Sequence, residues 1–184
     1  MSKKAYELGI LVGRFQNLHL GHEDMIRKAL AICDTVAVFI GSSQESGTSK
    51  NPYSYELRAE LLRAVFGDQL QIFPLPDIGI GNTALWGEYV LDNVKKQLGR
   101  LPDLLVTGKE ARRVNWLDGE QGQYVSELQV PKKIDISATE VRSFLLNNDR
   151  ESWEKYTSPE LWSYYETLQQ LTLAAKDVSE TASL

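Results

Sequence analysis

Short, mostly apolar runs alternate with segments of helical periodicity along this chain, and this alternation limits the possible folds more than any other feature. The runs are Leu8 to Val12, Thr35 to Ile40, Leu70 to Phe73 and Asp103 to Thr107. Each run is too short for a helix, and runs of this kind are typical of strands that are buried on both faces of a parallel sheet. The chain therefore predicts an α/β fold.

Apolar residues at helical spacing fill the intervals between these runs. Helices are predicted to begin near Glu23, at Ala84 and at Trp153. Two more are predicted to follow caps, one formed by Ser54 and the other by Ser137 or Thr139. We predict a Rossmann-like, doubly wound parallel sheet with helices on both faces and a C-terminal helical region. The prediction is a single domain, 1–184, with an α/β core (5–150), C-terminal helices (151–175) and a polar tail (176–184). The polar stretch 108–133 has no predicted element.

Composition limits the function classes. The 184 residues carry a net charge of −5, which argues against general binding to nucleic acids or to anionic membranes. No segment approaches the roughly 20 apolar residues of a membrane span, and the first residues lack the pattern of a secretory signal. The one cysteine, Cys33, has apolar neighbours and is expected to pack in the core. We expect a cytoplasmic enzyme or binding protein.

The predicted strands lead into segments that suit a ligand site. Gly13, Gly41 and Gly108 follow three of the strands, and a segment containing Pro and Gly follows Phe73. In doubly wound sheets, ligands bind at the carboxyl ends of the strands. We therefore expect these four segments to meet at one edge of the sheet.

The stretch GRFQNLHLGH, Gly13 to His22, contains both histidines of the chain. Gly13 permits a sharp turn of the backbone, and Arg14 offers a guanidinium fork. Gly21 and His22 lie where a helix is expected to begin, and helix N-termini, imidazoles and guanidinium groups all bind phosphate. The alternatives are two surface histidines without function or a metal pair. The spacing is not that of two ligands on one helix face, and no third histidine or nearby cysteine completes a metal site.

A second stretch, ISATEVR, runs from Ile136 to Arg142 and has the pattern of a helix start. Ser137 or Thr139 can cap the helix, and Glu140 lies in its first turn. The positive charge of Arg142 is unfavourable so close to a helix N-terminus. A bound anion would compensate for it, because hydroxyls, backbone N–H groups and an arginine at a helix start form a phosphate site.

Together the two stretches resemble the signatures GRFQPxHxGH and ISxTxxR of the nucleotidyltransferase superfamily that contains the nicotinamide mononucleotide (NMN) adenylyltransferases. The resemblance covers residues 7–165 and is weakest between 109 and 133. Asn17 replaces the usual proline and can still form a turn. The resemblance implies catalytic roles for Arg14, His19, His22 and Arg142. It implies contacts with ATP or its phosphates for Gly13, Phe15, Gly21, Gly108, Ser137 and Thr139.

Two further stretches resemble the archaeal-type NMN adenylyltransferases. The loop 41–54 ends in Lys50, Asn51, Pro52, Tyr53 and Ser54, and the segment 76–86 reads PDIGIGNTALW. The resemblance implies that NMN is bound by Lys50, Asp77, Asn82 and Trp86. The chemistry is suitable, since an indole can stack on a pyridinium ring and an amide can pair with a carboxamide. The alternatives are a solvated loop lysine for Lys50 and a core position for Trp86.

The resemblance implies the reaction ATP + NMN → NAD + pyrophosphate, with Mg²⁺ bound to ATP and no metal held by protein side chains. It also implies a homo-oligomer; nucleic acids and membranes are not expected as partners. Two alternatives stay open, a sister transferase that uses phosphopantetheine or a phospho-alcohol, and a non-catalytic nucleotide sensor of the same fold. The basic cluster of Lys109, Arg112 and Arg113 either faces phosphates or is solvated.

Overall fold

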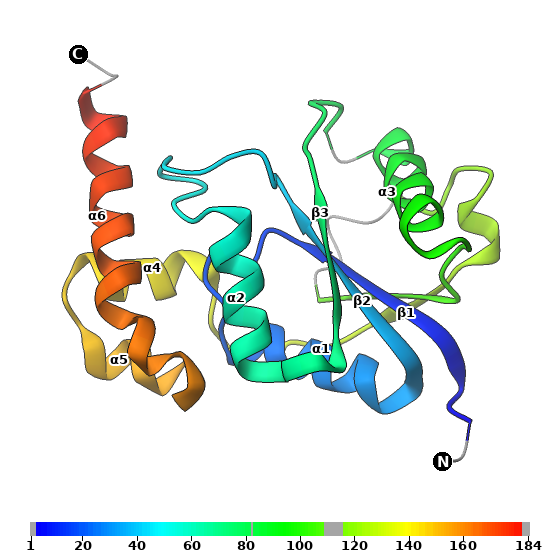
Figure 1. The fold of residues 1–184 in the computed structure, drawn as a ribbon, viewed down its shortest axis with the longest axis horizontal. Coiled ribbons are helices and arrows are strands. Elements are labelled where there is room, and N and C mark those ends of the chain that lie inside the picture. The colour runs from blue at the N-terminus through cyan, green and yellow to red at the C-terminus, as the bar shows by residue number, and fades with distance from the viewer. Residues whose placement is uncertain (1–2, 82, 109–115, 182–184) are drawn as a thin grey trace.

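The computed structural model describes residues 3–81, 83–108 and 116–181 (Figure 1). The strands are β1 (Tyr6–Gly13), β2 (Cys33–Gly41), β3 (Gln71–Leu75), β4 (Leu104–Thr107) and β5 (Ser126–Gln129). The α-helices are α1 (Leu20–Ile32), α2 (Tyr55–Phe66), α3 (Ala84–Leu98), α4 (Ala138–Leu146), α5 (Arg150–Lys155) and α6 (Tyr165–Thr181). Short 3₁₀ helices cover Gly67–Gln69, Gly122–Tyr124 and Pro159–Tyr164. No helix in these ranges is both long and apolar enough to cross a membrane.

The strands form one parallel sheet in the order β3-β2-β1-β4-β5. β1 is central, since it pairs with β2 along its length from Tyr6 to Gly13 and with β4 through Gly9 and Ile10. The strand order reverses between β1 and β4, and such a switch point is where doubly wound sheets bind their ligands. The predicted Rossmann-like α/β fold is confirmed.

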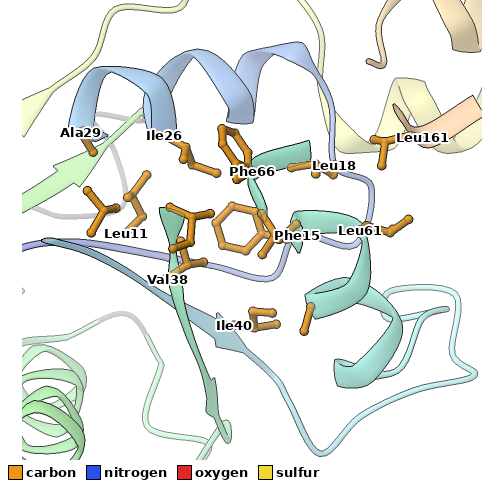
Figure 2. Packing of buried hydrophobic residues seen from close by; sticks show 14 of the residues in the cluster. Leu11, Phe15, Leu18, Ile26, Ala29, Val38, Ile40, Leu61, Phe66 and Leu161 are labelled. Atoms are coloured by element: carbon orange, nitrogen blue, oxygen red, sulfur yellow. The ribbon is translucent and has the colours of Figure 1, made fainter. Parts of the chain in front are cut away.

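Apolar cores lie on both faces of the sheet. On one face, Leu11 of β1 packs with Ile26 of α1 and Phe66 of α2 (Figure 2). On the other face, Ile10 of β1 packs with Val94 of α3. Figure 1 shows α4, α5 and α6 grouped beyond α2, on the far side of the sheet from α3. The helices on both faces and the C-terminal helical region are therefore present as predicted.

The structure differs from the prediction at the start of α1, in the C-terminal helical region and within the stretch 108–133. α1 begins at Leu20, before Glu23, because His19 caps it. α6 continues to Thr181, beyond the predicted limit at 175, so the predicted polar tail is helical over its first part. β5 lies within the stretch 108–133, where the sequence predicts no element. Most of its side chains are exposed, and its pairing with β4, which local pattern does not reveal, defines it as a strand.

Cys33 begins β2 and is fully buried. A Cβ atom on Gly9 would lie 2.5 Å from the sulfur of Cys33, so the glycine makes room for the thiol between β1 and β2. Burial raises the pKa of this thiol to about 11. Because the thiolate is the reactive form, Cys33 behaves as a small apolar core residue.

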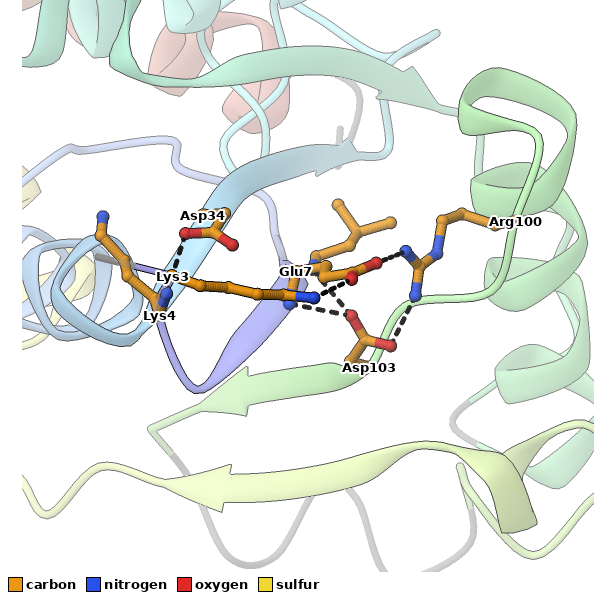
Figure 3. Close-up of polar contacts among 7 residues, drawn as sticks. Lys3, Lys4, Glu7, Asp34, Arg100 and Asp103 are labelled. Carbon is orange, nitrogen blue, oxygen red and sulfur yellow. Dashed lines mark hydrogen bonds and ion pairs between the residues drawn. The ribbon is translucent and has the colours of Figure 1, made fainter. Parts of the chain in front are cut away.

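Charged side chains gather at the amino ends of β1 and β4 (Figure 3). The carboxylate of Asp103 accepts hydrogen bonds from the backbone N–H groups of Glu7 and Leu8, at 3.1 and 2.8 Å. Arg100 forms ion pairs with Glu7 and Asp103, and bonds from Lys3 and then Arg100 lower the pKa of Glu7 to about 2. Exposed pairs add little to stability. We infer that the main role of Asp103 here is to align the start of β1 with β4.

Candidate functional site

His19 ends the loop that joins β1 to α1 (residues 14–19, the β1–α1 loop) and caps the helix. Its Nδ1 accepts a hydrogen bond from the backbone N–H of Gly21 at 3.1 Å, and the residue is 6% exposed. A ring nitrogen that accepts a hydrogen bond carries no proton, so the proton of a neutral His19 is on Nε2. The capping bond therefore makes Nε2 the donor nitrogen of this imidazole.

The two histidines lie against each other at the start of α1. The rings of His19 and His22 stack with their centroids 3.8 Å apart, and the ring of Phe15 lies 5.1 Å from that of His22. A Cβ atom on Gly21 would come within 3.0 Å of two atoms of the His19 ring. The glycine at position 21 therefore gives the imidazole room to lie directly at the helix start.

Phe15 produces the turn after β1. It is buried and has a φ of 49°, in the left-handed region that non-glycine residues rarely adopt. A Cβ atom on Gly13 would lie 3.1 Å from the Phe15 ring. The turn that the sequence analysis assigned to Gly13 thus depends on Phe15, and Gly13 provides the space for its ring.

Arg58 of α2 holds this loop to the end of β2, a role that the sequence analysis did not predict. Its side chain is fully buried. Nη1 donates to the carbonyl oxygens of Arg14 and Gly41, each at 2.8 Å, and Nη2 donates to that of Ser42 at 3.1 Å. Each of the first two carbonyls precedes a residue in the left-handed region, Phe15 with a φ of 49° and Ser42 with a φ of 46°. Arg58 therefore fixes the peptide planes on which both strained turns depend.

Three arginines, Arg14, Arg58 and Arg142, contribute positive charge to this edge of the sheet. Burial and then the charge of Arg14 lower the pKa of Arg58 to about 10, and the same two causes lower the pKa of Arg142. Arg142 also donates to Oγ1 of Thr139 at 3.4 Å. The charge of Arg14 therefore acts unfavourably on those of Arg58 and Arg142, in a chain whose net charge is −5. A bound anion would relieve that repulsion.

The start of α4 adjoins the start of α1. Oγ of Ser137 caps α4 by accepting from the N–H of Glu140 at 3.2 Å, and it donates to the Glu140 carboxylate at 2.5 Å. Ile136 lies 3.8 Å from the place that a Cβ atom on Gly21 would occupy. The two helices thus begin close together, and the two sequence stretches, distant along the chain, meet in space.

Gly108 follows β4 and lies against α1. A Cβ atom at this position would come within 2.4 Å of the sulfur of Met25, so the glycine allows α1 to approach the end of β4 closely. Gly108 therefore lines the switch point between β1 and β4. The predicted residues Asn82, Lys109, Arg112 and Arg113 lie outside the described ranges.

The turn after β3 is attached to the loop after β2. The side chain of Gln44 accepts from the backbone N–H of Asp77 at 2.9 Å and donates to its carbonyl oxygen at 3.0 Å. Oδ1 of Asp77 accepts from the N–H of Gly79 at 2.9 Å. Lys50 is exposed in the loop between β2 and α2 (residues 42–54, the β2–α2 loop). Gln44 therefore joins the two segments that contain Asp77 and Lys50.

Trp86 is partly buried in the first turn of α3. Its ring centroid lies 5.3 Å from that of Tyr89 and 6.3 Å from that of Trp116. A Cβ atom on Gly87 would overlap the backbone oxygen of Trp116, so the chain at Trp116 packs directly on α3. Trp86 thus belongs to an aromatic cluster and keeps part of its surface accessible.

Gln16 and Asn51 join the β1–α1 loop to the β2–α2 loop. Oε1 of Gln16 accepts from the backbone N–H of Tyr53 at 2.9 Å, and its Nε2 donates to Oδ1 of Asn51 at 3.3 Å. Arg14 also contacts that Asn51 oxygen at 3.5 Å. Sequence reasoning missed both roles, because a buried amide beside a strand end has the same local pattern as a surface residue. Both are at most 3% exposed.

Comparison with known proteins places the chain in a family. Residues 10–144 match the model of the cytidylyltransferase-like family. The chain is 35% identical to the nicotinamide-nucleotide adenylyltransferase of Thermococcus kodakarensis, over 80% of this chain and 76% of that protein. It belongs to the nicotinamide-nucleotide adenylyltransferase family. The corresponding protein of Pyrococcus horikoshii is 32% identical over 88% of this chain and 83% of its own length.

Solved structures have the fold found in this nicotinamide-nucleotide adenylyltransferase family member. The structure of a bifunctional NMN adenylyltransferase/ADP ribose pyrophosphatase from Francisella tularensis matches with a TM-score of 0.78 at 22% identity. The match covers 95% of this chain and 55% of that one. A structure of such a bifunctional protein complexed with AMP and a manganese ion, also from Francisella tularensis, matches with a TM-score of 0.75. The chain thus spans about half the length of these solved chains and shares their fold.

Proposed function

We propose that this chain transfers the adenylyl group of ATP to NMN, which forms NAD and releases pyrophosphate. One observation carries the proposal: the stacked histidines at the start of α1 lie beside the start of the helix that carries Arg142, and the charge of Arg14, at the end of β1, acts on Arg142. Such a site suits the phosphates of a nucleotide. The names of the relatives, at 30–35% identity, support NMN as the acceptor.

The reaction requires charge neutralisation more than proton transfer. An oxygen of the NMN phosphate attacks the α-phosphorus of ATP, and the bond from that phosphorus to the bridging oxygen of pyrophosphate breaks. The second pKa of a phosphate monoester is about 6, so the attacking oxygen is already ionised near neutral pH and needs no general base. Positioning of the two phosphates and stabilisation of the developing charge then supply the acceleration.

The roles follow from the groups that each residue offers. In this proposal Nε2 of His19 and the neighbouring ring of His22 donate to the ATP phosphates, and Arg14 bridges to the substrate phosphate. Arg142, with the start of α4 at Ser137 and Thr139, binds the β- and γ-phosphates of ATP. Because Gly13, Gly21 and Gly108 carry no Cβ atom, the side chains of Phe15, His19 and Met25 lie directly against the backbone at these positions.

A divalent cation enters this scheme as part of the substrate. Mg²⁺ usually binds substrate phosphates, keeps several waters and takes few protein ligands. In the part of the chain that the structure describes, no group of three His, Cys, Asp or Glu side chains could hold a metal ion. Because Mg²⁺ commonly binds substrate phosphates, we propose that it arrives bound to ATP and helps to neutralise the departing pyrophosphate.

An assay with competing acceptors tests the proposal. The purified chain is incubated with Mg²⁺, ATP and one of three acceptors: NMN, nicotinic acid mononucleotide or phosphopantetheine. In a fourth mixture, CTP replaces ATP and glycerol phosphate is the acceptor. The expected result is NAD formation from NMN. Turnover with phosphopantetheine or glycerol phosphate instead would identify a sister transferase, and nucleotide binding without any turnover would identify a sensor.

Replacing Trp86 by alanine is expected to weaken NMN binding about 2- to 30-fold, because an indole face over a cationic ring contributes roughly 0.5–2 kcal/mol. ATP affinity, measured in the same titration calorimetry, should stay within about twofold. Trp86→Phe is the matched control, since it keeps an aromatic face and should retain part of the NMN affinity. An unchanged NMN affinity with a lower unfolding temperature would assign Trp86 to packing with Tyr89 and Trp116 alone.

We also propose that the chain is one nucleotidyltransferase domain that acts as a homo-oligomer. α6 exposes the apolar side chains of Leu171 and Val178, which lie seven residues apart on one side of the helix and which a second copy could cover. Light scattering of the purified protein measures the mass directly. A mass of 20.8 kDa at micromolar concentration would contradict the oligomer.

A further inference from the structure

The hydroxyl of Tyr53 joins the C-terminal helix to the β1–α1 loop. Tyr53 lies at the end of the β2–α2 loop and is fully buried. Its oxygen lies 2.7 Å from Oγ1 of Thr172 on α6 and 3.2 Å from Oδ1 of Asn17 in the β1–α1 loop. Thr172 and Asn17 are themselves 4% and 2% exposed. Residues from three distant parts of the sequence therefore meet at one buried hydroxyl group.

The proton on each hydroxyl determines the direction of these bonds. Oγ1 of Thr172 lies 2.7 Å from the carbonyl oxygen of Leu168, which can only accept, so the proton of Thr172 points there. The equally short contact between Thr172 and Tyr53 must then use the proton of Tyr53. Tyr53 has no second proton, so its oxygen can only accept from Asn17.

Asn17 can meet this demand by a half turn of its amide. The half turn exchanges Oδ1 and Nδ2 and directs an N–H toward the oxygen of Tyr53. Without it, Nδ2 of Asn17 is a buried donor with no hydrogen-bond partner, which is costly. A single consistent order results, in which Asn17 donates to Tyr53, Tyr53 to Thr172, and Thr172 to the carbonyl of Leu168.

The β1–α1 loop is bound by Tyr53 at two successive residues. The backbone N–H and carbonyl of Tyr53 pair with the side-chain amide of Gln16, at 2.9 and 3.2 Å, while the hydroxyl meets Asn17. Gln16 and Asn17 lie between Arg14 and His19, in a segment that contains no helix or strand. The position of the loop therefore depends on side-chain bonds of this kind.

The other end of the hydrogen-bonded chain is anchored by packing. α6 lies beside α4 in Figure 1, and Nε2 of Gln169 donates to the carbonyl oxygen of Leu145 at 3.0 Å. Thr172 lies one turn further along α6. The helix that carries Arg142 and the helix that carries Thr172 thus form one support for the hydroxyl of Tyr53.

We propose that Tyr53 and Thr172 are positioning residues for adenylyl transfer, which act through Asn17 to hold the β1–α1 loop in its ATP-binding geometry. This inference rests on the proposed function, because the role of the loop in binding ATP belongs to that proposal. It is particular to a chain with asparagine at position 17, since the proline usual there offers no side-chain donor. α6 thereby becomes part of the machinery that sets the site.

Kinetics of Tyr53→Phe, Thr172→Val and the matched control Thr172→Ser test the proposal. Removing either hydroxyl should lower kcat/KM for ATP about tenfold, the effect of losing one buried hydrogen bond, and leave KM for NMN within about twofold. Thr172→Ser keeps the hydroxyl and should stay within about twofold of the wild type. Variants that unfold at a lower temperature but keep kcat/KM for ATP would show a merely structural role and overturn the proposal.

A double-mutant cycle tests the route through Asn17. If the effect of Thr172 passes through that side chain, Asn17→Ala combined with Thr172→Val should be no worse than Asn17→Ala alone. Independent effects that multiply to about a hundredfold would overturn the route. If the wild type forms no NAD, the proposed function fails by itself. The same double-mutant cycle, with ATP affinity measured by calorimetry, then tests this inference. Additive losses of ATP affinity in Asn17→Ala and Thr172→Val would contradict it.

Discussion

Replacing Arg58 by methionine is expected to destabilise the protein by about 3–5 kcal/mol and to remove most of its activity. The substitution leaves the buried carbonyl groups of Gly41 and Ser42, and the partly buried one of Arg14, without their donors. Each unsatisfied buried acceptor costs about 1–3 kcal/mol, which partial rearrangement of the loops would reduce. Urea unfolding measures the change in the free energy of unfolding, and the NAD assay measures the change in kcat.

The activity loss has a separate physical cause. The left-handed conformations of Phe15 and Ser42 persist only while the surrounding structure holds them, and Arg58 binds the carbonyl before each one. Without it, both loops can relax, and the positions of Arg14 and His19 relax with them. We expect kcat to fall at least about a hundredfold, since small displacements of positioning groups can have effects of that size.

Two control variants separate the effect of the positive charge, the effect of the hydrogen-bond geometry and the effect of placing a methionine in α2. Arg58→Lys keeps the positive charge but offers a point donor in place of a fork, so it should recover part of the stability and little of the activity. Arg63→Met removes an exposed arginine from the same helix and should change the free energy of unfolding by less than about 0.5 kcal/mol. A stable and fully active Arg58→Met variant would show that the hydrogen bonds of Arg58 to these carbonyl groups are not needed to hold the two loops.

The features that the sequence predicts well are local or follow from general topology. Ser54 and Ser137 are caps because a hydroxyl next to a helical pattern satisfies the first N–H groups, and both accept the expected bonds. The meeting of the segments at Gly13, Gly41 and Gly108 follows from a rule about parallel sheets: loops at the carboxyl ends of strands share one edge. These inferences require no knowledge of which side chains touch.

The features that the sequence does not predict depend on long-range contacts. Arg58 has the pattern of any helix arginine, and the identity of its carbonyl partners depends on the turns at Phe15 and Ser42. The bond between Tyr53 and Thr172 joins residues 119 positions apart, with no local pattern at either end. β5 is a polar edge strand that is defined by its neighbour. In each case the partner, and not the residue itself, determines the role.

Replacing His19 by alanine is expected to lower kcat about 10²- to 10³-fold, the usual effect of removing one preorganised donor from a site of developing charge. The imidazole has two roles in this chain, because Nδ1 caps α1 and leaves Nε2 to donate to ATP. The loss of the cap alone should destabilise the protein by about 1 kcal/mol. Affinity for NMN, measured by calorimetry, should change little, since the proposed partner of His19 is an ATP phosphate.

His19→Asn separates the two roles. Asparagine is a strong helix cap, and its Oδ1 can accept the N–H of Gly21 as Nδ1 does in the wild type. This variant should therefore recover the stability lost in His19→Ala and should still lack turnover, because its amide does not reproduce the Nε2 donor or the stacking on His22. If His19→Asn restored turnover together with stability, the effect of His19 on the rate would come from the start of α1, and the backbone N–H groups of that helix would become the principal donors to the phosphates.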